Sequence, residues 1–566
     1  MKKLLLPLLL LFFGVFLFYP LLYVVQGAFF APRESGGFRF TFDFFALVFQ
    51  NELYRASFRN SLLIGAAATL ACLFLTLPLA VAFHRLTFPG KRWLQAAMLA
   101  PLILPPFVGA IGFKHFFARF GSLNLLLMDL GVLSPQNPID WFGQGGLAGI
   151  IFMEVLHLFP ILFLSVSAAL ANIDPSLRDA AANLGARGFY LFRTVTLPLA
   201  MPGIFAGCSI VFVSAFTDLG TPLIFDFQAT VPTQIFNTAS ESGDNPVGFA
   251  LVLLTLLLVL ACFLLGKKFG DGGSHAMLAR ASSTENLRRL SPLSSWLVSL
   301  AVAGLLLAAV LPHLGVLLSS FSDQWFMAVL PNRISGQAYA EVFSDELTAL
   351  SIRNSLVYSL FSSGLDLVLG VAIAHLLARE TFPGKSLLDA IAMLPLALPG
   401  LVLAFGYVAG FNTAVPWLSW LNPRKDPTFL LIISYSVRRL PYIVRAAYAG
   451  YQQTSVTFEE ASWNLGASRW HTLRKITLPL IAANLVAGTL LTFSFAMLEV
   501  SDSLLLAMET RFAPITKAIY ELVQRPSPHA TALACALGVL AMLLLAASLL
   551  LASRILGRKM GQLFRA

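Results

Sequence analysis

Long apolar stretches separated by short polar segments make up most of the chain. A helix needs about 20 mostly apolar residues to cross the hydrocarbon core of a bilayer. Twelve stretches are candidates, six in each half of the chain. They are residues 4–30, 61–83, 94–117, 147–171, 199–221, 247–266, 296–320, 355–378, 387–411, 428–450, 480–503 and 530–553. Because lipid offers the backbone no hydrogen-bonding partner, we expect an all-α polytopic membrane protein with about twelve transmembrane helices.

Composition excludes a soluble globular protein. Hydrophobic residues make up 57% of the 566 residues, charged residues only 12%, and the mean hydropathy is +0.79. An average soluble domain carries about 25% charged residues. The apolar stretch 4–30 is too long for the core of a secretory signal peptide, so we expect a retained helix. The four cysteines stand alone in apolar runs and are predicted to be packing residues: Cys72, Cys208, Cys262 and Cys535.

Basic residues predict which side of the membrane each loop faces, because cytoplasmic loops are enriched in Lys and Arg. With Lys2 in the cytoplasm, alternation of the spans places most basic clusters on that side. These clusters are Arg85, Lys91 and Arg92; Arg178, Arg187 and Arg193; Lys267, Lys268, Arg280, Arg288 and Arg289; and Arg554, Arg558, Lys559 and Arg565. Arg33, Arg55 and Arg333 fall on the opposite side, so the bias is moderate. We expect both termini in the cytoplasm.

Short segments that occur twice in the same order indicate an internal duplication. The matching pairs are 59–62 and 353–356 (Arg-Asn-Ser-Leu), 88–91 and 382–385 (Phe-Pro-Gly-Lys), 183–186 and 464–467 (Asn-Leu-Gly-Ala), and 196–199 and 477–480 (Thr-Leu-Pro-Leu). Six spans, an even number, separate the later copies, so the repeat is parallel and predicts a pseudo-two-fold axis along the membrane normal. We expect two six-helix halves, with an extra outer loop in the first and a flexible linker between them. The corresponding ranges are 1–266 and 295–566 for the halves, 118–145 for the extra loop and 267–294 for the linker.

Two of the repeated segments lie in equivalent loops that each predict a short, rigid helix. Asp174 or Ser455 can cap the helix and Pro175 suits its first turn, while Gly185 and Gly466 can end it in a left-handed conformation. Small residues keep one face of each helix open to close approach by another protein. The residues in this pattern are Asp179, Ala180 and Ala181 in the first loop and Glu460 and Ala461 in the second. Leu197-Pro198 and Leu478-Pro479 then begin the next spans.

The spacing of both loops resembles the E-A-A loop of bacterial binding-protein-dependent ABC import permeases. In each copy an acidic residue, Ala and a small residue are followed, after three residues, by Gly, and after nine more by an apolar residue, Thr, Leu and Pro. The departures are conservative: Asp179 replaces Glu, Val195 replaces Ile and Ser462 replaces the second Ala. The resemblance implies the type I importer permease fold in a bacterial inner membrane. It also implies a homodimeric ATPase docked on these loops and a periplasmic substrate-binding protein.

Motifs for nucleotide or covalent chemistry are absent from the sequence. Gly384-Lys385-Ser386 ends like a Walker A loop, but Arg379 stands where its first Gly is needed. Gly143-x-Gly145-x-x-Ala148 imitates a dinucleotide fingerprint but opens a membrane span with no strand before it. There is no zinc-protease motif and no Ser-His-Asp cluster. We therefore expect no enzyme activity, no bound cofactor and no resident metal in this chain, with ATP hydrolysed by the partner.

Ionisable residues inside predicted spans are the candidates for the substrate path, because their burial in lipid is costly. Asp218 and Glu499 occupy equivalent positions near the outer ends of two spans, and Asp502 and Glu154 are further candidates. The Asp218–Glu499 pair is explained equally by an outer gate that attracts a cation and by structural carboxylates bonded to neighbouring helices. For Arg438 and Arg439 the sequence favours a structural role, in which they either pair with acidic residues across the bundle or extend toward water. Prolines predict breaks in the third and ninth spans and make those spans plausible pore-lining elements: Pro101, Pro105, Pro106, Pro395 and Pro399.

The fused arrangement of two such halves is similar to ferric-iron, thiamine and aminoethylphosphonate import permeases. Residues 216–222 (Phe-Thr-Asp-Leu-Gly-Thr-Pro) look most like the ferric-iron type, so iron(III) is the expected substrate, with thiamine or an aminoethylphosphonate or polyamine as alternatives. Two other classes compete: a secondary transporter driven by ions, which twelve spans in two parallel halves also fit, and a membrane-embedded enzyme, for which no catalytic cluster is found.

Overall fold

Helices account for nearly all regular structure in the computed structural model of this protein, which describes residues 2–32, 37–143, 146–241, 245–270, 288–412 and 420–556. Within these ranges the only strands form three two-stranded sheets, and no strand exceeds three residues. The all-α polytopic class predicted from the sequence is therefore confirmed. The predicted linker at 267–294 lies partly outside the described residues, which resume at Arg288.

The elements of the first half follow the predicted spans. In chain order they are α1 (Lys2–Phe13), the π-helical turn η1 (Gly14–Phe18), α2 (Tyr19–Phe29), β1 (Phe30–Pro32), β2 (Phe38–Phe40), α3 (Asp43–Gln50), α4 (Glu52–Arg85), β3 (Leu86–Thr87), α5 (Lys91–Ala97), α6 (Ala100–Ile103), α7 (Pro106–Phe117), α8 (Ser122–Asp129), α9 (Leu147–Ala171), α10 (Pro175–Asn183), α11 (Gly188–Leu191), the π-helical turn η2 (Phe192–Thr196), α12 (Leu197–Thr217), α13 (Gly220–Ile224), α14 (Val231–Glu241) and α15 (Pro246–Gly270).

The second half has the same order of elements. They are β4 (Arg288–Arg289), α16 (Pro292–Ser320), β5 (Ser322–Gln324), β6 (Arg333–Ile334), α17 (Gln337–Glu341), α18 (Glu346–Arg379), α19 (Lys385–Met393), the 3₁₀ turn η3 (Leu394–Leu396), α20 (Gly400–Phe411), α21 (Thr428–Gln453), α22 (Thr457–Asn464), α23 (Arg469–Thr472), the π-helical turn η5 (Leu473–Thr477), α24 (Leu478–Met497), α25 (Ser501–Leu506), the 3₁₀ turn η6 (Thr510–Phe512), α26 (Ile515–Val523) and α27 (Pro528–Leu556).

Equivalent elements of the two halves agree closely in length. The helices α4 and α18 are both 34 residues long, and α11 with η2 spans the same number of residues as α23 with η5. The two copies differ mainly between α7 and α9, where the first half contains the extra helix α8 within the predicted loop 118–145. The sequence duplication is thus also a duplication of structure.

Nine helices of the described residues are long and apolar enough to cross a membrane, or eleven if two bent pairs each count as one span. These eleven match eleven of the twelve predicted stretches. The remaining prediction, 428–450, is the 26-residue helix α21, which is long enough but carries Arg438, Arg439 and Arg445. The count of twelve spans is therefore not established, although the segment is helical as predicted.

The two bent spans occur where prolines predicted breaks. The pair Lys91–Leu102 and Pro106–Asp129 bends by 94°, and the pair Lys385–Leu396 and Gly400–Phe411 bends by 97°. The second segment of each pair begins directly after a proline, Pro105 or Pro399. Because proline removes a backbone donor and restricts the preceding residue, an unbroken helix is disfavoured at both points.

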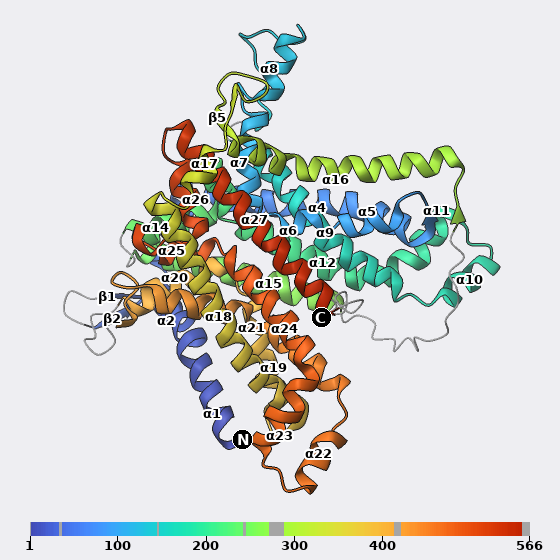
Figure 1. Ribbon diagram of the computed structural model, residues 1–566, viewed down its shortest axis with the longest axis vertical. Coiled ribbons are helices and arrows are strands. Elements are labelled where there is room, and N and C mark those ends of the chain that lie inside the picture. The colour runs from blue at the N-terminus through green and yellow to red at the C-terminus, as the bar shows by residue number, and fades with distance from the viewer. Residues whose placement is uncertain are drawn as a thin grey trace. The chain divides into compact units, whose positions relative to one another are not determined.

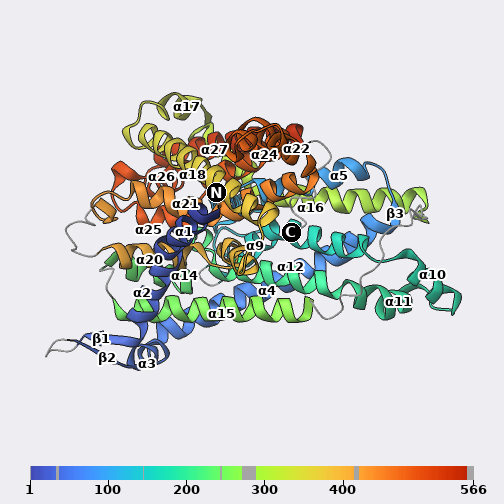
Figure 2. The same ribbon diagram turned by 90° about the horizontal axis from the view of Figure 1, so that it is seen from below.

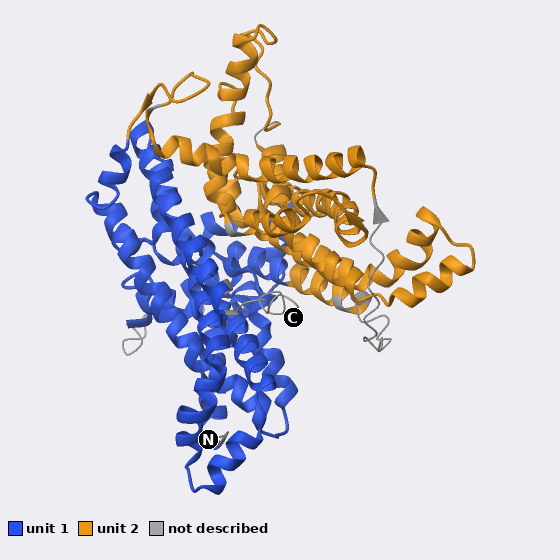
Figure 3. Cartoon of the chain, turned by 45° about the vertical axis from the view of Figure 1, so that its right-hand side comes forward, with its two compact units in different colours: residues 1–51, 234–256, 336–566 blue, residues 52–233, 257–335 orange. Residues whose placement is uncertain are grey.

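The chain forms two compact units, which are coloured separately in Figure 3. Each unit consists mainly of one half of the chain but contains the first spanning helix of the other half. Unit 1 comprises residues 1–51, 234–256 and 336–566, and unit 2 comprises residues 52–233 and 257–335. In unit 1, α2 of the first half packs against α20 of the second, and Tyr407 donates a hydrogen bond of 2.6 Å to Phe16 O. In unit 2, α16 of the second half packs against α7 of the first.

Two equivalent glycines permit this exchanged packing. A Cβ at Gly112 in α7 would lie 1.9 Å from Pro312 O of α16, and a Cβ at Gly406 in α20 would lie 3.0 Å from Pro20 of α2. The first distance excludes a side chain and the second is tighter than most real Cβ contacts, so each glycine allows its helix to approach a proline-containing turn of the exchanged helix. Small residues serve this purpose in membrane helix packing generally.

Candidate functional site

The predicted loop helices are present as α10 and α22, and we use "loop helices" for this pair. In the first, the Asp174 carboxylate accepts a hydrogen bond of 2.8 Å from Ser176 N, and this bond lowers the pKa of the carboxyl. Pro175 occupies the first turn, as predicted. In the second, Ser455 accepts a longer bond of 3.3 Å from Thr457 N. Asp174 is thus the better of the two predicted caps.

Both loop helices end in the same left-handed turn. Gly185 has φ +92° and Gly466 has φ +83°. The residue after each glycine donates back to the helix, Ala186 N to Ala181 O and Ala467 N to Ser462 O, in the 6→1 pattern that closes a helix at glycine. The prediction that these glycines end the helices is confirmed.

The remaining predicted loop residues divide between an exposed surface and the start of the next span. Asp179, Ala180, Glu460 and Ala461 are exposed, and Ala181 is half-buried. Leu197-Pro198 and Leu478-Pro479 form the first turns of α12 and α24, as predicted.

Two leucines that the sequence reasoning did not single out dominate the exposed surface. Leu184 and Leu465 each precede the terminal glycine of a loop helix and are each 89% exposed. Apolar side chains so exposed at equivalent positions indicate a surface for a protein partner. The repeated Asn-Leu-Gly-Ala segment could have predicted this exposed leucine. The glycine alone is enough to end the helix, so a leucine repeated before it needs another explanation.

A buried ion pair anchors α22 to the spanning helices of unit 1. Arg379, at the end of α18, lies 3.1 Å from Glu459 of α22, and the two side chains are only 10% and 5% exposed. Arg379 also donates to Tyr451 O and Thr454 O at 3.2 and 3.1 Å. Thr477 donates to the same Glu459 oxygen at 3.2 Å. One guanidinium therefore joins α18, the end of α21 and α22.

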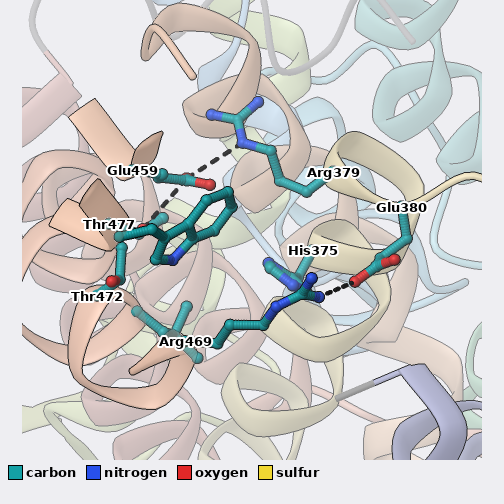
Figure 4. A pocket seen from close by; sticks show the side chains of 9 residues that line it. His375, Arg379, Glu380, Glu459, Arg469, Thr472 and Thr477 are labelled. Atoms are coloured by element: carbon teal, nitrogen blue, oxygen red, sulfur yellow. Dashed lines mark hydrogen bonds and ion pairs between the residues drawn. The ribbon is translucent and has the colours of Figure 1, made fainter. Parts of the chain in front are cut away.

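The ion pair lines one side of a cavity of about 180 Å³ (Figure 4). A second pair, Arg469–Glu380 at 3.2 Å, lies on the other side. The described lining consists of His375, Arg379, Glu380, Glu459, Trp463, Arg469, Thr472, Leu473 and Thr477. In Figure 1 this region, with α22 and α23, lies at the same end of unit 1 as the chain's N-terminus.

The first loop helix is anchored differently. Arg85 ends α4 as Arg379 ends α18, but it donates to Thr196 at 2.9 Å. The position equivalent to Glu459 holds Arg178, which cannot form an ion pair with Arg85. α10 also has no buried residue, whereas α22 buries Glu459 and Ser462. The two loop helices thus have the same exposed leucine and terminal glycine but are attached to the spanning helices by different contacts.

A cluster of charged side chains lies inside unit 1 at the break between α24 and α25. Arg438 and Arg439 of α21 each form an ion pair with Glu499, and Arg438 also lies 3.5 Å from Asp502. Ser434 donates to Asp502 at 2.8 Å. The prediction that these arginines pair with acidic residues across the bundle is confirmed. Glu499 is thereby surrounded by cations and only 5% exposed.

The equivalent region of the first half has no such ion pairs among the described residues. His157 replaces Arg438, Thr221 replaces Asp502, and His157 Nδ1 lies 3.0 Å from Pro101 O. The Asp218 carboxylate accepts a hydrogen bond of 2.9 Å from Thr221 N at the start of α13, and the buried Glu154 lies beside it. Asp218 is half-buried, so of the predicted acidic pair it is the more accessible.

The early repeated segment fixes another helix in each half. Ser61 accepts a hydrogen bond of 2.9 Å from Val231 N, the first residue of α14, and Ser355 accepts one of 2.7 Å from Ile515 N, the first residue of α26. Asn354 donates to Arg511 O and Ala513 O beside the second of these. Each serine therefore accepts a hydrogen bond from the first backbone N–H of the equivalent helix in its half. No group of three or more metal-ligating side chains occurs among the described residues.

The sequence and fold define a multi-span helical membrane protein built from two repeated halves, and comparison with protein families identifies its class. The family described as "binding-protein-dependent transport system inner membrane component" matches residues 56–272 and 366–562, and this chain belongs to it. The two matches correspond to the two halves, so the protein is a fused two-half ABC importer permease and a multi-pass inner membrane protein.

Several curated relatives share most of the chain. A putative ferric transport system permease protein, FbpB 1 of Haemophilus influenzae, is 27% identical over 87% of this chain and 76% of its own. The thiamine transport system permease protein ThiP of Escherichia coli is 24% identical over 75% of this chain and 74% of its own. A solved bacterial alginate ABC transporter is 19% identical, covers 48% of this chain and 96% of its own, and has a TM-score of 0.39.

Substitution of the two terminal glycines tests the loop helices as a docking surface. An ideal Cβ at Gly185 or Gly466 meets nothing within 4 Å, so only backbone strain opposes a side chain there. We expect Gly185→Val with Gly466→Val to cost about 1–2 kcal/mol per site in the left-handed turn and to reduce co-purification of a partner ATPase at least several-fold. Gly185→Asn with Gly466→Asn is the matched control, because Asn tolerates this conformation. Equal ATPase recovery from both double variants would contradict the assignment.

Proposed function

We propose that this chain is the membrane subunit of an ATP-driven importer of iron(III), which a periplasmic binding protein delivers and a homodimeric ABC ATPase energises. The observation that carries the proposal is the pair of matched loop helices, each ending in a highly exposed leucine and an adjoining left-handed glycine. Two equivalent surfaces on one chain suit a two-fold symmetric partner. This chain performs no covalent chemistry and holds no cofactor.

The proposed mechanism is a shift between two conformations driven by the partner. ATP binding closes the ATPase dimer, the loop helices move with it, and the substrate cavity changes from inward-facing to outward-facing. Hydrolysis resets the cycle. The free energy comes from the different affinity of the ATPase for the two states of the permease. In this arrangement both termini and both loop helices face the cytoplasm, as the basic residues predict.

Support for iron(III) as the substrate comes from the names of curated relatives. Curated relatives named as ferric or Fe(3+) transport permeases match 79–87% of this chain at 26–27% identity, among them one from Actinobacillus pleuropneumoniae. Relatives named for thiamine and, in Salmonella typhimurium, 2-aminoethylphosphonate transport are 24% and 28% identical over 75% and 46% of this chain. These two substrates are the alternatives.

Uptake by the reconstituted complex distinguishes the substrates. The chain is purified from its host with any co-eluting ATPase, placed in proteoliposomes, and supplied with ATP and the host's candidate periplasmic binding proteins, each tested separately. We expect ATP-dependent uptake of radioactive iron(III) that excess thiamine or 2-aminoethylphosphonate does not reduce. Uptake of either competitor instead would reassign the substrate. Uptake that continues without ATP and stops with a proton uncoupler would indicate the rival class, a secondary transporter.

For the substrate path, we propose that Asp218 faces the moving cation while Glu499 and Asp502 hold α25 in place. The difference in surroundings supports this division, since Glu499 already neutralises two arginines and Asp218 has no cationic partner among the described contacts. Asp218→Asn is expected to keep its hydrogen bond to Thr221 N and to lower iron uptake several-fold at unchanged protein yield. Uptake equal to that of the unaltered chain would remove Asp218 from the path.

A further inference from the structure

Each half carries a small apolar hairpin directly after its first spanning helix. In the first half, α2 ends at Phe29 and β1 pairs antiparallel with β2, Phe30 opposite Phe40. In the second half, α16 ends at Ser320 and β5 pairs antiparallel with β6. Figure 2 shows the first hairpin beyond the end of α2, beside α3. The turn residues 33–36 lie outside the described residues.

The same backbone hydrogen bond fixes both hairpins to their helices. Thr41 N, just after β2, donates to Phe29 O at 2.8 Å, and Ser335 N, just after β6, donates to Phe321 O at 2.7 Å. Each hairpin is therefore held by a backbone hydrogen bond to the end of the spanning helix before it. A strand of three residues is about 10 Å long, and the polar interface of one leaflet is about 5–8 Å thick. The hairpins thus stay within reach of the membrane surface.

Large apolar side chains cover the first hairpin without being buried. Phe38, Phe40 and Phe42 are 62%, 56% and 61% exposed. Phe40 stacks on Phe29 at 5.6 Å and contacts Phe42 edge-on at 5.1 Å, so the rings form one continuous surface. The charged groups described here, Arg39 and Asp43, neutralise each other at 2.7 Å.

The second hairpin repeats this pattern with different residues. Phe326, Leu330 and Ile334 are 74%, 63% and 76% exposed, and Arg333 pairs with Asp323 at 3.6 Å. Trp325 stacks on His115 of α7 with ring centroids 5.0 Å apart, which fixes the hairpin within unit 2. Apolar character is thus repeated at the same place in both halves although the residue types differ.

We propose that the two hairpins are a matched pair of membrane-surface anchors, with their apolar side chains inserted at the headgroup–acyl boundary of the leaflet opposite the N-terminus. Exposed apolar surface of this extent marks an interaction site, and it continues the lipid-facing surface of the span, where Leu22 of α2 is 65% exposed. Paired charges and bulky apolar groups at the end of a span suit the interface rather than water. A lipid surface requires only apolar character, whereas a protein partner would require particular side chains at the two sites.

Nitroxide accessibility in lipid vesicles tests the proposal on the full-length chain. The four native cysteines are replaced by alanine, and single nitroxides are placed by Phe38→Cys and Phe326→Cys in vesicles of phosphatidylethanolamine and phosphatidylglycerol. Leu22→Cys is the lipid-facing control, and Asn137→Cys, on the exposed segment after α8, is the aqueous control. Collisions with oxygen, which partitions into lipid, are compared with collisions with a water-soluble nickel chelate.

We expect both hairpin positions to favour oxygen several-fold more than Asn137→Cys does, and to remain so when the binding protein is added. A ratio equal to that of Asn137→Cys, protection from both collision partners, or protection that appears only with the binding protein would each overturn the proposal; the last would assign the hairpins to a protein partner. If the cysteine-free chain fails to fold, photo-cross-linking to lipid from benzoylphenylalanine at the same positions of the unaltered chain gives the same decision.

Discussion

Arg379→Ala is expected to uncouple ATP hydrolysis from transport while leaving the ATPase bound. The substitution removes a guanidinium that joins α18, α21 and α22, and it leaves the Glu459 carboxylate buried without a cation. Removing one partner of a buried ion pair costs about 3–5 kcal/mol. The exposed face of α22, with Glu460 and Leu465, is not touched by the change. We therefore expect substrate uptake per ATP hydrolysed to fall at least tenfold in proteoliposomes.

The first half offers a matched control for this variant. Arg85→Ala removes the hydrogen bond to Thr196, and a hydrogen bond to a charged group is worth about 1.5–3 kcal/mol. This variant therefore measures the loss of the equivalent arginine where no acid stands at the position of Glu459. Arg178→Glu places an acid in the first loop helix where Glu459 stands in the second. We expect Arg379→Ala to uncouple transport in the Arg178→Glu variant as well. The added acid lies in the first loop helix and cannot replace the anchor lost from the second. Equal coupling ratios for Arg379→Ala and the unaltered chain would show that this anchor transmits no movement.

Glu499→Ala is expected to be the most destabilising single substitution in the second half. Arg438 and Arg439 are 18% and 16% exposed; Arg439 would lose its carboxylate partner inside the bundle, and Arg438 would keep only the 3.5 Å contact with Asp502. An uncompensated buried charge costs about 3–5 kcal/mol, which is a large part of the stability of a typical domain. We expect a large drop in the temperature at which detergent-solubilised protein loses its monodisperse gel-filtration peak.

Two companion variants separate charge from packing. Asp218→Ala, at the equivalent position of the first half, removes the hydrogen bond from Thr221 N and the contact with Glu154 but leaves no arginine unpaired, so it should cost less than Glu499→Ala. Joint replacement of Arg438, Arg439, Glu499 and Asp502 by Met or Leu removes the charges together and should restore most of the lost stability. A joint variant as unstable as Glu499→Ala would mean that the shape of the cluster, not its charge balance, decides stability.

Features set by neighbouring residues could be predicted from the sequence. The loop helices, their glycine ends and the proline breaks each depend on a few consecutive residues, and the structure has them where expected. The exchange of α2 and α16 between the units could not be predicted, since apolar helices give no sign of which apolar neighbour they contact. Glycines such as Gly112 and Gly406 mark that contact, and their role is visible once Pro312 and Pro20 lie against them.

Pairings between distant residues also escaped the sequence reasoning. Arg379 and Glu459 are 80 residues apart, and no local sequence pattern links them. Glu459 also lies next to Glu460, the acidic residue that fits the loop motif. Glu499 was predicted as a path or structural carboxylate, and only the two arginines of α21 reveal how strongly it is held. Charge alone cannot indicate whether a buried acid faces a substrate or a neighbouring helix.

The π-helical turns η2 and η5 give each half one spare residue between a loop helix and the span that follows. Each wide turn ends at a threonine of the anchor, Thr196 or Thr477. A π turn holds one residue more than the α-helical turn it replaces. If it tightened, everything before it would advance by about 1.5 Å and rotate by about 100° while the span stayed still. If both turns tightened in this way, a push on each loop helix would also rotate it about its axis.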